Sequence, residues 1–394
     1  MKNTKFHKIY FLLFVGVLFI ASCAKENVQP DLPTLPADSV IVTPDISKID
    51  DDIEQFMSRF NVPGLSLAVT KNGKLVYAKG YGYADQENGE KVDTAHLFRI
   101  ASLSKFITST GIMNLIDQGQ LSMDDKVFGP EGVLGDDFGT TPYPQYITDI
   151  TIRNLLHHEV GGWGNSSNDP AFTQPSLSLD KLISWVIDNR PLTVQPGTKT
   201  DYSNLGFQIL GRVIEKLSGK SYVDYMQENI LTPSGVKNMQ MAEGSLEDRK
   251  FNEVKYYGQS GQNPYGYSSG VINRLNSCGG WIASAIDLLR VMVHVDGFST
   301  VPDILSPSAI QMMTTSSPRS NYASGLLVNS SNNWWHGGSL SGSRTWIVRT
   351  AKGYNWAILM NTRSTDSEFT SALDKLVWPA VNDAATAWPD IDLF

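Results

Sequence analysis

The sequence predicts an α+β fold in which helices flank one antiparallel sheet built from both ends of the chain. Two β-rich runs, at residues 65–70 and 75–78, surround an Asn72-Gly73 pair, which is a strong hairpin signal. Further β-rich runs appear only after residue 333. Residues 106–274 show helical patterns and long polar loops instead, so we expect a mainly helical subdomain inserted between the sheet-forming parts, 46–105 and 275–390.

Composition and charge are those of an ordinary globular protein. The chain has 394 residues, of which 41% are hydrophobic and 18% charged, so it can bury a large core in one big domain or two. The formal net charge of −8 argues against nucleic acid as a partner, because neutralising phosphates requires a basic surface. We expect one folded domain over residues 46–390.

The first residues have the pattern of a bacterial targeting segment. Three lysines precede an apolar run at 9–21 that is too short for a comfortable membrane span. Ala21-Ser22 stands directly before Cys23, which resembles a lipoprotein signal whose cysteine is acylated; a cleaved signal without lipid is the alternative. We therefore expect a signal peptide over 1–22, lipidation of Cys23 and a proline-containing tether over 23–45. The location would be extracytoplasmic, in the periplasm, and Ala24 favours the outer membrane because aspartate there often retains lipoproteins at the inner one.

The hydrophobic pattern places helices and strands along the rest of the chain. Apolar residues recur at helical spacing from Ile46 to Phe60 and stop at Pro63-Gly64. Two further helices are expected at 182–187, capped by Ser178, and at 207–217, closed by Gly219. The C-terminal region is expected to form strands at 334–338, 345–348 and 355–360, then a last helix near 367–385.

The stretch from Ser102 to Lys105 carries the first chemical signal. It places a serine three residues before a lysine, directly ahead of an apolar run that reads as a helix. Residues i and i+3 share one helix face, so the serine hydroxyl and the lysine amine are expected to meet. Ser102 would lie in the first turn, where unpaired N–H groups favour a developing negative charge. A lysine that is largely shielded from water can accept the hydroxyl proton of the serine and so activate it as a nucleophile.

Two more polar elements complete a possible site. Tyr202 and Asn204 lie two residues apart on a turn, so that a phenol and an amide can both face a cleft. The third element is His336-Gly337-Gly338-Ser339 on an expected strand. Its glycines allow close approach of the backbone to a substrate, and the N–H of Ser339 can act as a second oxyanion donor beside that of Ser102.

In order and spacing, these elements resemble the motifs of the serine β-lactamase and penicillin-binding-protein superfamily. The resemblance is to class C β-lactamases, low-molecular-weight DD-peptidases and family VIII esterases, with S-x-x-K, then Y-x-N about a hundred residues later, then K/H-x-G about 130 beyond. Here Tyr202 lies 100 residues after Ser102, and His336 lies 134 residues after Tyr202. The match covers nearly all of the chain after the tether and implies a β-lactamase/transpeptidase-like fold.

The resemblance also implies roles for individual residues. Ser102 would be the acylated nucleophile, and Lys105 and Tyr202 would share the general acid and base work, with the identity of the base left open. The N–H groups of Ser102 and Ser339 would form the oxyanion hole. Substrate contacts would come from Asn204, His336, Gly338 and Ser339. No cofactor and no metal is implied.

The expected activity is that of an extracytoplasmic serine hydrolase working through a covalent acyl-serine intermediate. Its substrate would be a β-lactam, a D-amino-acid peptide or amide, or a small ester. The other expected partner is the membrane, through the lipid anchor only, and the oligomeric state stays open. The alternative is a non-hydrolysing penicillin- or peptidoglycan-binding sensor of the same fold. His336 replaces the lysine usual in class C β-lactamases, which favours a peptidase or esterase; Arg344 is a candidate for the missing positive charge.

Two other patterns are interpreted as coincidental or structural. The run 266–270 fits G-x-S-x-G, but a loop precedes it where a nucleophile elbow requires a buried strand. His157-His158-Glu159 lacks the HExxH spacing of a zinc site, so we expect solvated or structural histidines.

Overall fold

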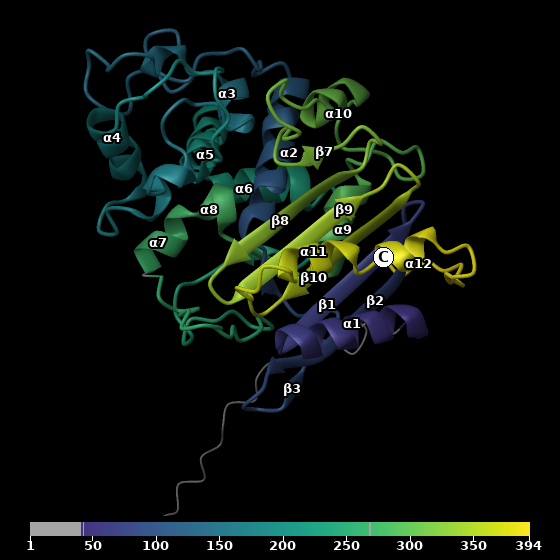
Figure 1. Cartoon of the computed structure of the whole chain (residues 1–394). Coiled ribbons are helices and arrows are strands. Elements are labelled where there is room, and N and C mark those ends of the chain that lie inside the picture. Colours follow the sequence, from purple (N-terminus) through teal and green to yellow (C-terminus); the bar gives the residue numbers. More distant parts are fainter. Residues whose placement is uncertain (1–40, 42, 268) are drawn as a thin grey trace, which may run out of the picture. The chain divides into compact units, whose positions relative to one another are not determined.

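A seven-stranded antiparallel sheet lies at the centre of the computed structural model (Figure 1). β1 pairs with β10 along its whole length, with Leu65 opposite Met360 and Lys71 opposite Tyr354. The two ends of the chain therefore build one sheet, as the sequence predicts. The strand order is β3-β2-β1-β10-β9-β8-β7, with bounds Gly64–Lys71 (β1), Lys74–Asp85 (β2), Glu90–Lys91 (β3), Leu327–Val328 (β7), Trp334–Leu340 (β8), Ser343–Arg349 (β9) and Tyr354–Met360 (β10).

The structure describes residues 41, 43–267 and 269–394. The predicted signal peptide, the predicted lipidation of Cys23 and nearly all of the predicted tether lie outside these residues. Ile41 donates its backbone N–H to Thr94 Oγ1 at 2.9 Å, and the Thr43 hydroxyl donates to the Ala78 carbonyl at 3.0 Å. Each helix in the described ranges is too short or too polar to cross a membrane.

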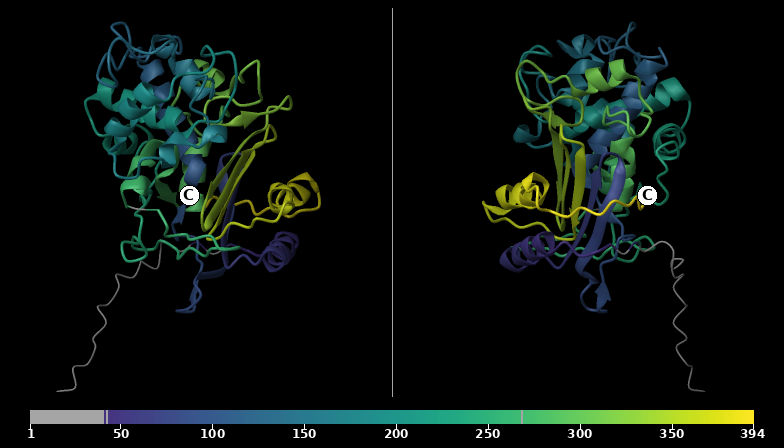
Figure 2. Two further views of the ribbon diagram at one scale, coloured as in Figure 1. Left: turned by 60° about the vertical axis from the view of Figure 1, so that its left-hand side comes forward. Right: turned by 90° about the vertical axis from the view of Figure 1, so that its right-hand side faces the viewer.

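The two faces of the sheet are covered by different helices. Trp356 and Ile358 of β10 pack toward α1 (Ser47–Phe60), α11 (Phe369–Lys375) and α12 (Trp378–Asn382), whereas Ala357 and Leu359 belong to the core shared with the other helices. Figure 2 shows α1 and the C-terminal helices on one side of the sheet and the remaining helices on the other. Because both faces are buried, β10 is apolar along most of its length instead of alternating with polar residues.

The predicted helices form where capping residues delimit them. The Ser178 side chain accepts a hydrogen bond from the Lys181 N–H at the start of α4, and Gly219 ends α5 in the left-handed region at φ 68°. Asn61 ends α1 in the same way, at φ 52°. The helices of the middle region are α2 (Ser104–Asp117), α3 (Ile152–Leu156), α4 (Leu179–Asn189), α5 (Asn204–Ser218), α6 (Tyr222–Met226), α7 (Ser269–Arg274), α8 (Asn276–Gly279), α9 (Ala285–Val293) and α10 (Pro307–Thr314).

Two features differ from the sequence prediction. A second sheet of three short strands, β4 (Phe98–Arg99), β6 (Trp281–Ala283) and β5 (Gln240–Met241), was not predicted, because strands of two or three residues carry no readable periodicity. The single helix expected near 367–385 is divided into α11 and α12. Pro379 explains the division, because proline lacks an N–H and its ring collides with the carbonyl four residues earlier.

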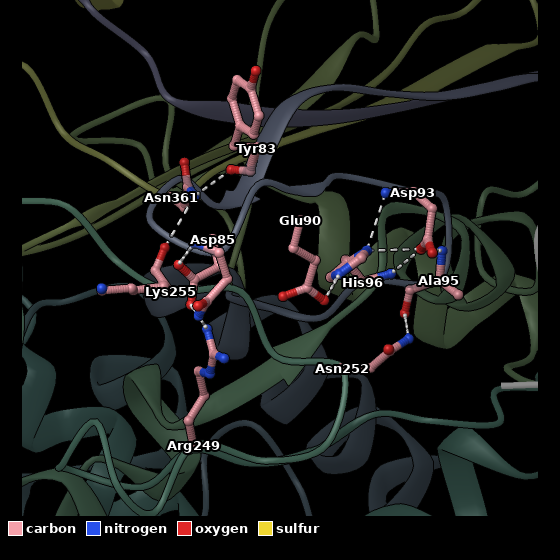
Figure 3. A network of polar contacts seen from close by, with 11 residues as sticks. Tyr83, Asp85, Glu90, Asp93, Ala95, His96, Arg249, Asn252, Lys255 and Asn361 are labelled. Atoms are coloured by element: carbon pink, nitrogen blue, oxygen red, sulfur yellow. Dashed lines mark hydrogen bonds and ion pairs between the residues drawn. The ribbon is translucent and has the colours of Figure 1, made fainter. Parts of the chain in front are cut away.

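A polar network fastens the chain segments that lead toward the nucleophile (Figure 3). His96 lies between the carboxylates of Asp93 and Glu90, at 2.8 and 3.1 Å. Burial opposes protonation of His96, but these two carboxylates outweigh it and raise its pKa. Asn361, at the end of β10, donates from Nδ2 to the carbonyls of Tyr83 and Lys255, both at 3.0 Å. The end of β10 is therefore fixed to two other segments.

Candidate active site

Ser102 lies in a tight turn at the entrance to α2. Residues Ala101–Leu103 form one turn of 3₁₀ helix, and α2 continues from Ser104. Ala101, directly before the serine, has a φ of +48°, a conformation that costs a residue with a side chain about 1–3 kcal/mol. Ser102 remains partly exposed, whereas Ala101 and Leu103 are buried. The turn thus holds one hydroxyl at the surface of an otherwise buried segment.

Lys105 is fully buried beneath Ser102, and three acceptors surround its amine. Nζ lies 3.2 Å from Ser102 Oγ, 2.6 Å from Asn204 Oδ1 and 2.7 Å from the Cys278 carbonyl oxygen. Asn204 and Cys278 bind two of the amine hydrogens. The third contact joins the amine to the serine hydroxyl at a distance over which a proton can pass between them. The i, i+3 relation predicted from the sequence is therefore present.

Tyr202 and Asn204 occupy the turn that opens α5. Ser203 caps the helix by accepting the Gly206 N–H, which fixes the residues on both sides of it. The Tyr202 ring lies beside the lysine, with Nζ 4.8 Å from the ring centroid. Its hydroxyl makes no hydrogen bond to another described residue. The structure thus brings the Tyr202 ring beside Lys105, although Tyr202 is not among the residues that line the cavity next to Ser102.

The C-terminal part of β8, around Gly338, packs directly against the segment that leads into Ser102. A Cβ on Gly338 would lie 2.2 Å from the Ile100 carbonyl oxygen and 2.3 Å from Thr345 Oγ1, so only glycine allows this approach. Thr345 donates to the Ile100 carbonyl at 3.0 Å, which ties β9 to the same segment. Ser339 is partly exposed next to this contact. Ser339 and Ser102 line the same cavity, so the Ser339 N–H is a candidate oxyanion donor.

Ser102 opens onto a cavity of about 490 Å³, a size suited to a small ligand. The wall combines segments from the nucleophile turn, the 165–172 loop, α5, α8, the end of β8 and the chain after β10. Its residues are Ala101, Ser102, Asn165, Asp169, Phe172, Asn204, Tyr267, Leu275, Cys278, Gly279, Ser339, Leu340 and Arg363.

Comparison with known proteins identifies this arrangement. The beta-lactamase family matches residues 49–377. The chain belongs to the beta-lactamase family. Protein flp of Staphylococcus aureus (strain MW2) is 25% identical over 328 residues, which are 80% of this chain and 63% of that protein. The octameric penicillin-binding protein homologue from Pyrococcus abyssi is 25% identical with a TM-score of 0.69, covering 85% of this chain and 78% of the other.

A further solved structure shares the fold of this beta-lactamase-family chain. The D-amino acid amidase from Ochrobactrum anthropi SV3 has a TM-score of 0.68 at 22% identity, covering 85% of this chain and 98% of that one. The Ser102–Lys105 arrangement agrees with membership of this family. The chain spans less than two thirds of the length of the staphylococcal relatives.

His336, the predicted substrate contact of the third motif, is buried behind the cavity wall in this beta-lactamase-family fold. Its Nε2 lies 3.2 Å from the hydroxyl of Tyr322. Burial and the nearby charge of Lys105 lower the pKa of His336 to about 3, so the imidazole is neutral at physiological pH. Gly338 likewise packs beneath the wall. Among the predicted substrate contacts, Asn204 and Ser339 line the cavity, whereas His336 and Gly338 support it.

His158 is a second buried histidine that sequence analysis did not place at the site. Its ring centroid lies 4.1 Å from that of Tyr202, and Nδ1 accepts the Ser203 N–H at 3.1 Å. Burial and the charge of Lys105 hold the pKa of His158 well below its usual range. A neutral His158 therefore packs against the Tyr202 ring and supports its position.

The described residues contain no group of three or more His, Cys, Asp or Glu side chains arranged to hold a metal ion.

Arg363, and not the candidate Arg344, places a positive charge in the cavity wall. Arg344 donates to Thr370 of α11 at 3.2 Å, on the face of the sheet away from Ser102. Arg363 lines the cavity, donating from Nε to Gln262 Oε1 at 3.0 Å and from Nη1 to Ser339 Oγ at 3.4 Å. Side chains alternate between the two faces of a strand, so Arg344 and the neighbouring buried Thr345 of β9 must point to opposite faces. This alternation was a sequence-level reason to expect Arg344 to point away from the site. Arg363 lies in a loop without periodicity, where only the fold reveals its direction.

Proposed function

We propose that this chain hydrolyses its substrate through a covalent acyl group on Ser102. The observation that carries the proposal is the buried Lys105 amine, which lies 3.2 Å from the Oγ of Ser102, a residue that lines a ligand-sized cavity. Complete burial of a lysine is costly, because its ammonium loses contact with water. A buried lysine therefore needs a functional role or a full set of hydrogen-bond partners.

The reaction follows from these positions. Ser102 Oγ attacks the substrate carbonyl carbon while its proton passes to the Lys105–Tyr202 pair. The N–H groups of Ser102 and Ser339 stabilise the resulting oxyanion. When the intermediate collapses, the bond from carbonyl carbon to leaving group breaks, and the leaving group takes up the proton. Water then attacks the acyl-serine by the same route in reverse, releasing the acid and restoring the hydroxyl.

The candidate acyl donors are β-lactams, D-amino-acid peptides or amides, and small esters. The third motif itself supplies no fixed cation, because His336 is buried and neutral, so the cation available to a substrate carboxylate is Arg363 in the cavity wall. The O. anthropi protein, by its name, acts on D-amino acid amides, and its likeness to this chain extends to the fold alone.

Intact-protein mass spectrometry after exposure to a fluorescent penicillin or to p-nitrophenyl acetate tests the proposal. We expect an adduct or turnover in the parent protein and neither in Ser102→Ala. Failure of both, with Ser102→Ala indistinguishable from the parent, would refute acyl-serine chemistry. An adduct on Ser102 that persists for hours without turnover would instead favour the sensor of the same fold.

We also propose that the protein acts outside the cytoplasm, held to a bacterial membrane by a lipid on Cys23. The basic residues, short apolar run and small residues before Cys23 support this placement. Metabolic labelling with a fatty-acid analogue tests it. The label should appear in the native protein and be lost in Cys23→Ser, and equal labelling of the two would contradict the anchor.

A further inference from the structure

The cavity carries one acidic and one basic side chain among its described lining residues, Asp169 and Arg363. Asp169 belongs to the Lys105 side of the nucleophile. Its Oδ2 accepts from Asn204 Nδ2 at 2.6 Å, and the same amide binds Lys105 through Oδ1 at 2.6 Å. Oδ1 of Asp169 accepts the Ala171 N–H at 3.0 Å. The carboxylate is thus held rigidly beside Asn204.

Arg363 belongs to the opposite, β8 side of the nucleophile. Gln262 and the hydroxyl of Ser339 hold its guanidinium, and Asn361 fixes the backbone two residues earlier to two other segments. The second terminal nitrogen, Nη2, makes no hydrogen bond within the described part of the chain. A guanidinium with a free edge beside the oxyanion strand matches a carboxylate in shape and charge.

Neither group forms an ion pair with any described residue, although both are only partly exposed. Removing a charge from water is costly, and partly buried charges in proteins are normally paired. Burial raises the pKa of Asp169, while hydrogen bonds from Asn204 and Ala171 act against this rise. A positively charged ligand group could form an ion pair with Asp169, and a negatively charged ligand group could form one with Arg363.

A free dipeptide carries these two charges in the required order. Its ammonium belongs to the residue that becomes the acyl group, its carboxylate belongs to the residue that leaves, and the scissile carbonyl lies between them. We propose, building on acyl transfer at Ser102, that the substrate class is a short zwitterionic peptide whose ammonium binds Asp169 and whose carboxylate binds Arg363.

The step balances without a further reactant except water. Ser102 Oγ bonds to the carbonyl carbon, the peptide C–N bond breaks, and the second residue leaves as a free amino acid carrying the serine proton on its nitrogen. Water then releases the first residue as its free acid, so that one peptide and one water give two amino acids.

The test measures kcat/KM for D-Ala-D-Ala and L-Ala-L-Ala, for the N-acetyl and C-amide forms of the better one, and for p-nitrophenyl acetate. In the parent protein, blocking either terminus should lower kcat/KM about 10- to 100-fold, the usual range for losing a charged hydrogen-bonded pair. Asp169→Asn should abolish the preference for the free amine but keep that for the free carboxylate. Arg363→Gln should do the reverse.

Arg59→Gln is the matched control, because it removes an exposed cation of α1 that pairs with Glu368 and does not line this cavity, and it should leave both preferences as in the parent. The inference is overturned if blocked and free peptides react equally, or if neither variant changes its own preference. Ser102-dependent turnover of p-nitrophenyl acetate without peptide preference would refute this inference alone, whereas no adduct and no turnover on any compound would refute acyl transfer itself.

Discussion

Lys105 Nζ and Asn204 Oδ1 lie 2.6 Å apart, in a pair that joins the first two motifs of the site. Asn204 therefore holds the lysine amine in addition to lining the cavity. Through its Nδ2 group the same side chain reaches Asp169 at 2.6 Å. One amide thus connects Lys105, the proposed general base, to Asp169, the carboxylate that we assign to substrate recognition.

Lys105→Met should abolish most of the activity while leaving the fold intact. The methionine fills the same buried space but cannot take a proton, and general bases of this kind contribute about 10²- to 10⁴-fold. We expect the rate of acyl-enzyme formation to fall by about 10³-fold, measured by rapid quench and intact mass. Lys105→Arg supplies no usable base, because a guanidinium stays protonated, and should be comparably slow. Retention of normal acylation in either variant would remove Lys105 from the mechanism.

Tyr202→Phe separates the chemistry of the phenol from the packing of its ring. The ring contact with His158, at 4.1 Å between centroids, should survive, so stability should change little. If the free hydroxyl shuttles the proton to the leaving group, kcat should fall about 10- to 10³-fold while KM changes less. The effect should be smaller for p-nitrophenyl acetate, whose leaving group needs no proton. Equal losses for peptide and activated ester would contradict this role.

Sequence reasoning reached the sheet, the hairpin and the spaced motifs because each leaves a local trace. The Asn72-Gly73 turn, the helix caps at Ser178 and Gly219 and the i, i+3 pair of Ser102 and Lys105 are all of this kind. Side chains from irregular loops leave no such trace. Asp169 and Arg363 share one cavity only because chain segments far apart in sequence fold together, and burial of His336 likewise depends on Tyr322 and the surrounding core.

Gly338→Ala should push β8 away from the nucleophile. Its Cβ would meet the Ile100 carbonyl oxygen at 2.2 Å, and a backbone shift of even about 1 Å at an oxyanion site can cost 10²-fold in rate. We expect kcat/KM to fall about 10- to 10²-fold, with about 1–3 kcal/mol lost in urea unfolding. Gly270→Ala is the control, because the nearest atom to its new Cβ is the Pro175 carbonyl oxygen at 3.4 Å. Unchanged activity in Gly338→Ala would contradict the close-approach argument.

His336 should make the folded state less stable in acid. Burial lowers its pKa from 6.5 to about 3 on folding, so between these values the unfolded chain binds a proton that the folded chain does not. Stability therefore rises with pH across this window, by at most about 1.4 kcal/mol per pH unit from this residue. His336→Gln can still hydrogen-bond Tyr322 but cannot titrate, so urea unfolding from pH 4 to 7 should show a shallower slope than in the parent.

His96→Gln provides the opposite case in the same experiment. Burial works against protonation of His96, but the carboxylates of Asp93 and Glu90 raise its pKa above 6.5, so its contribution is complete below pH 6.5 and is lost as the pH rises through the folded value. Removing it should flatten the stability profile on the alkaline side. If His336→Gln has the same acid slope as the parent, folding does not lower the pKa of His336, which would contradict the burial argument for this imidazole.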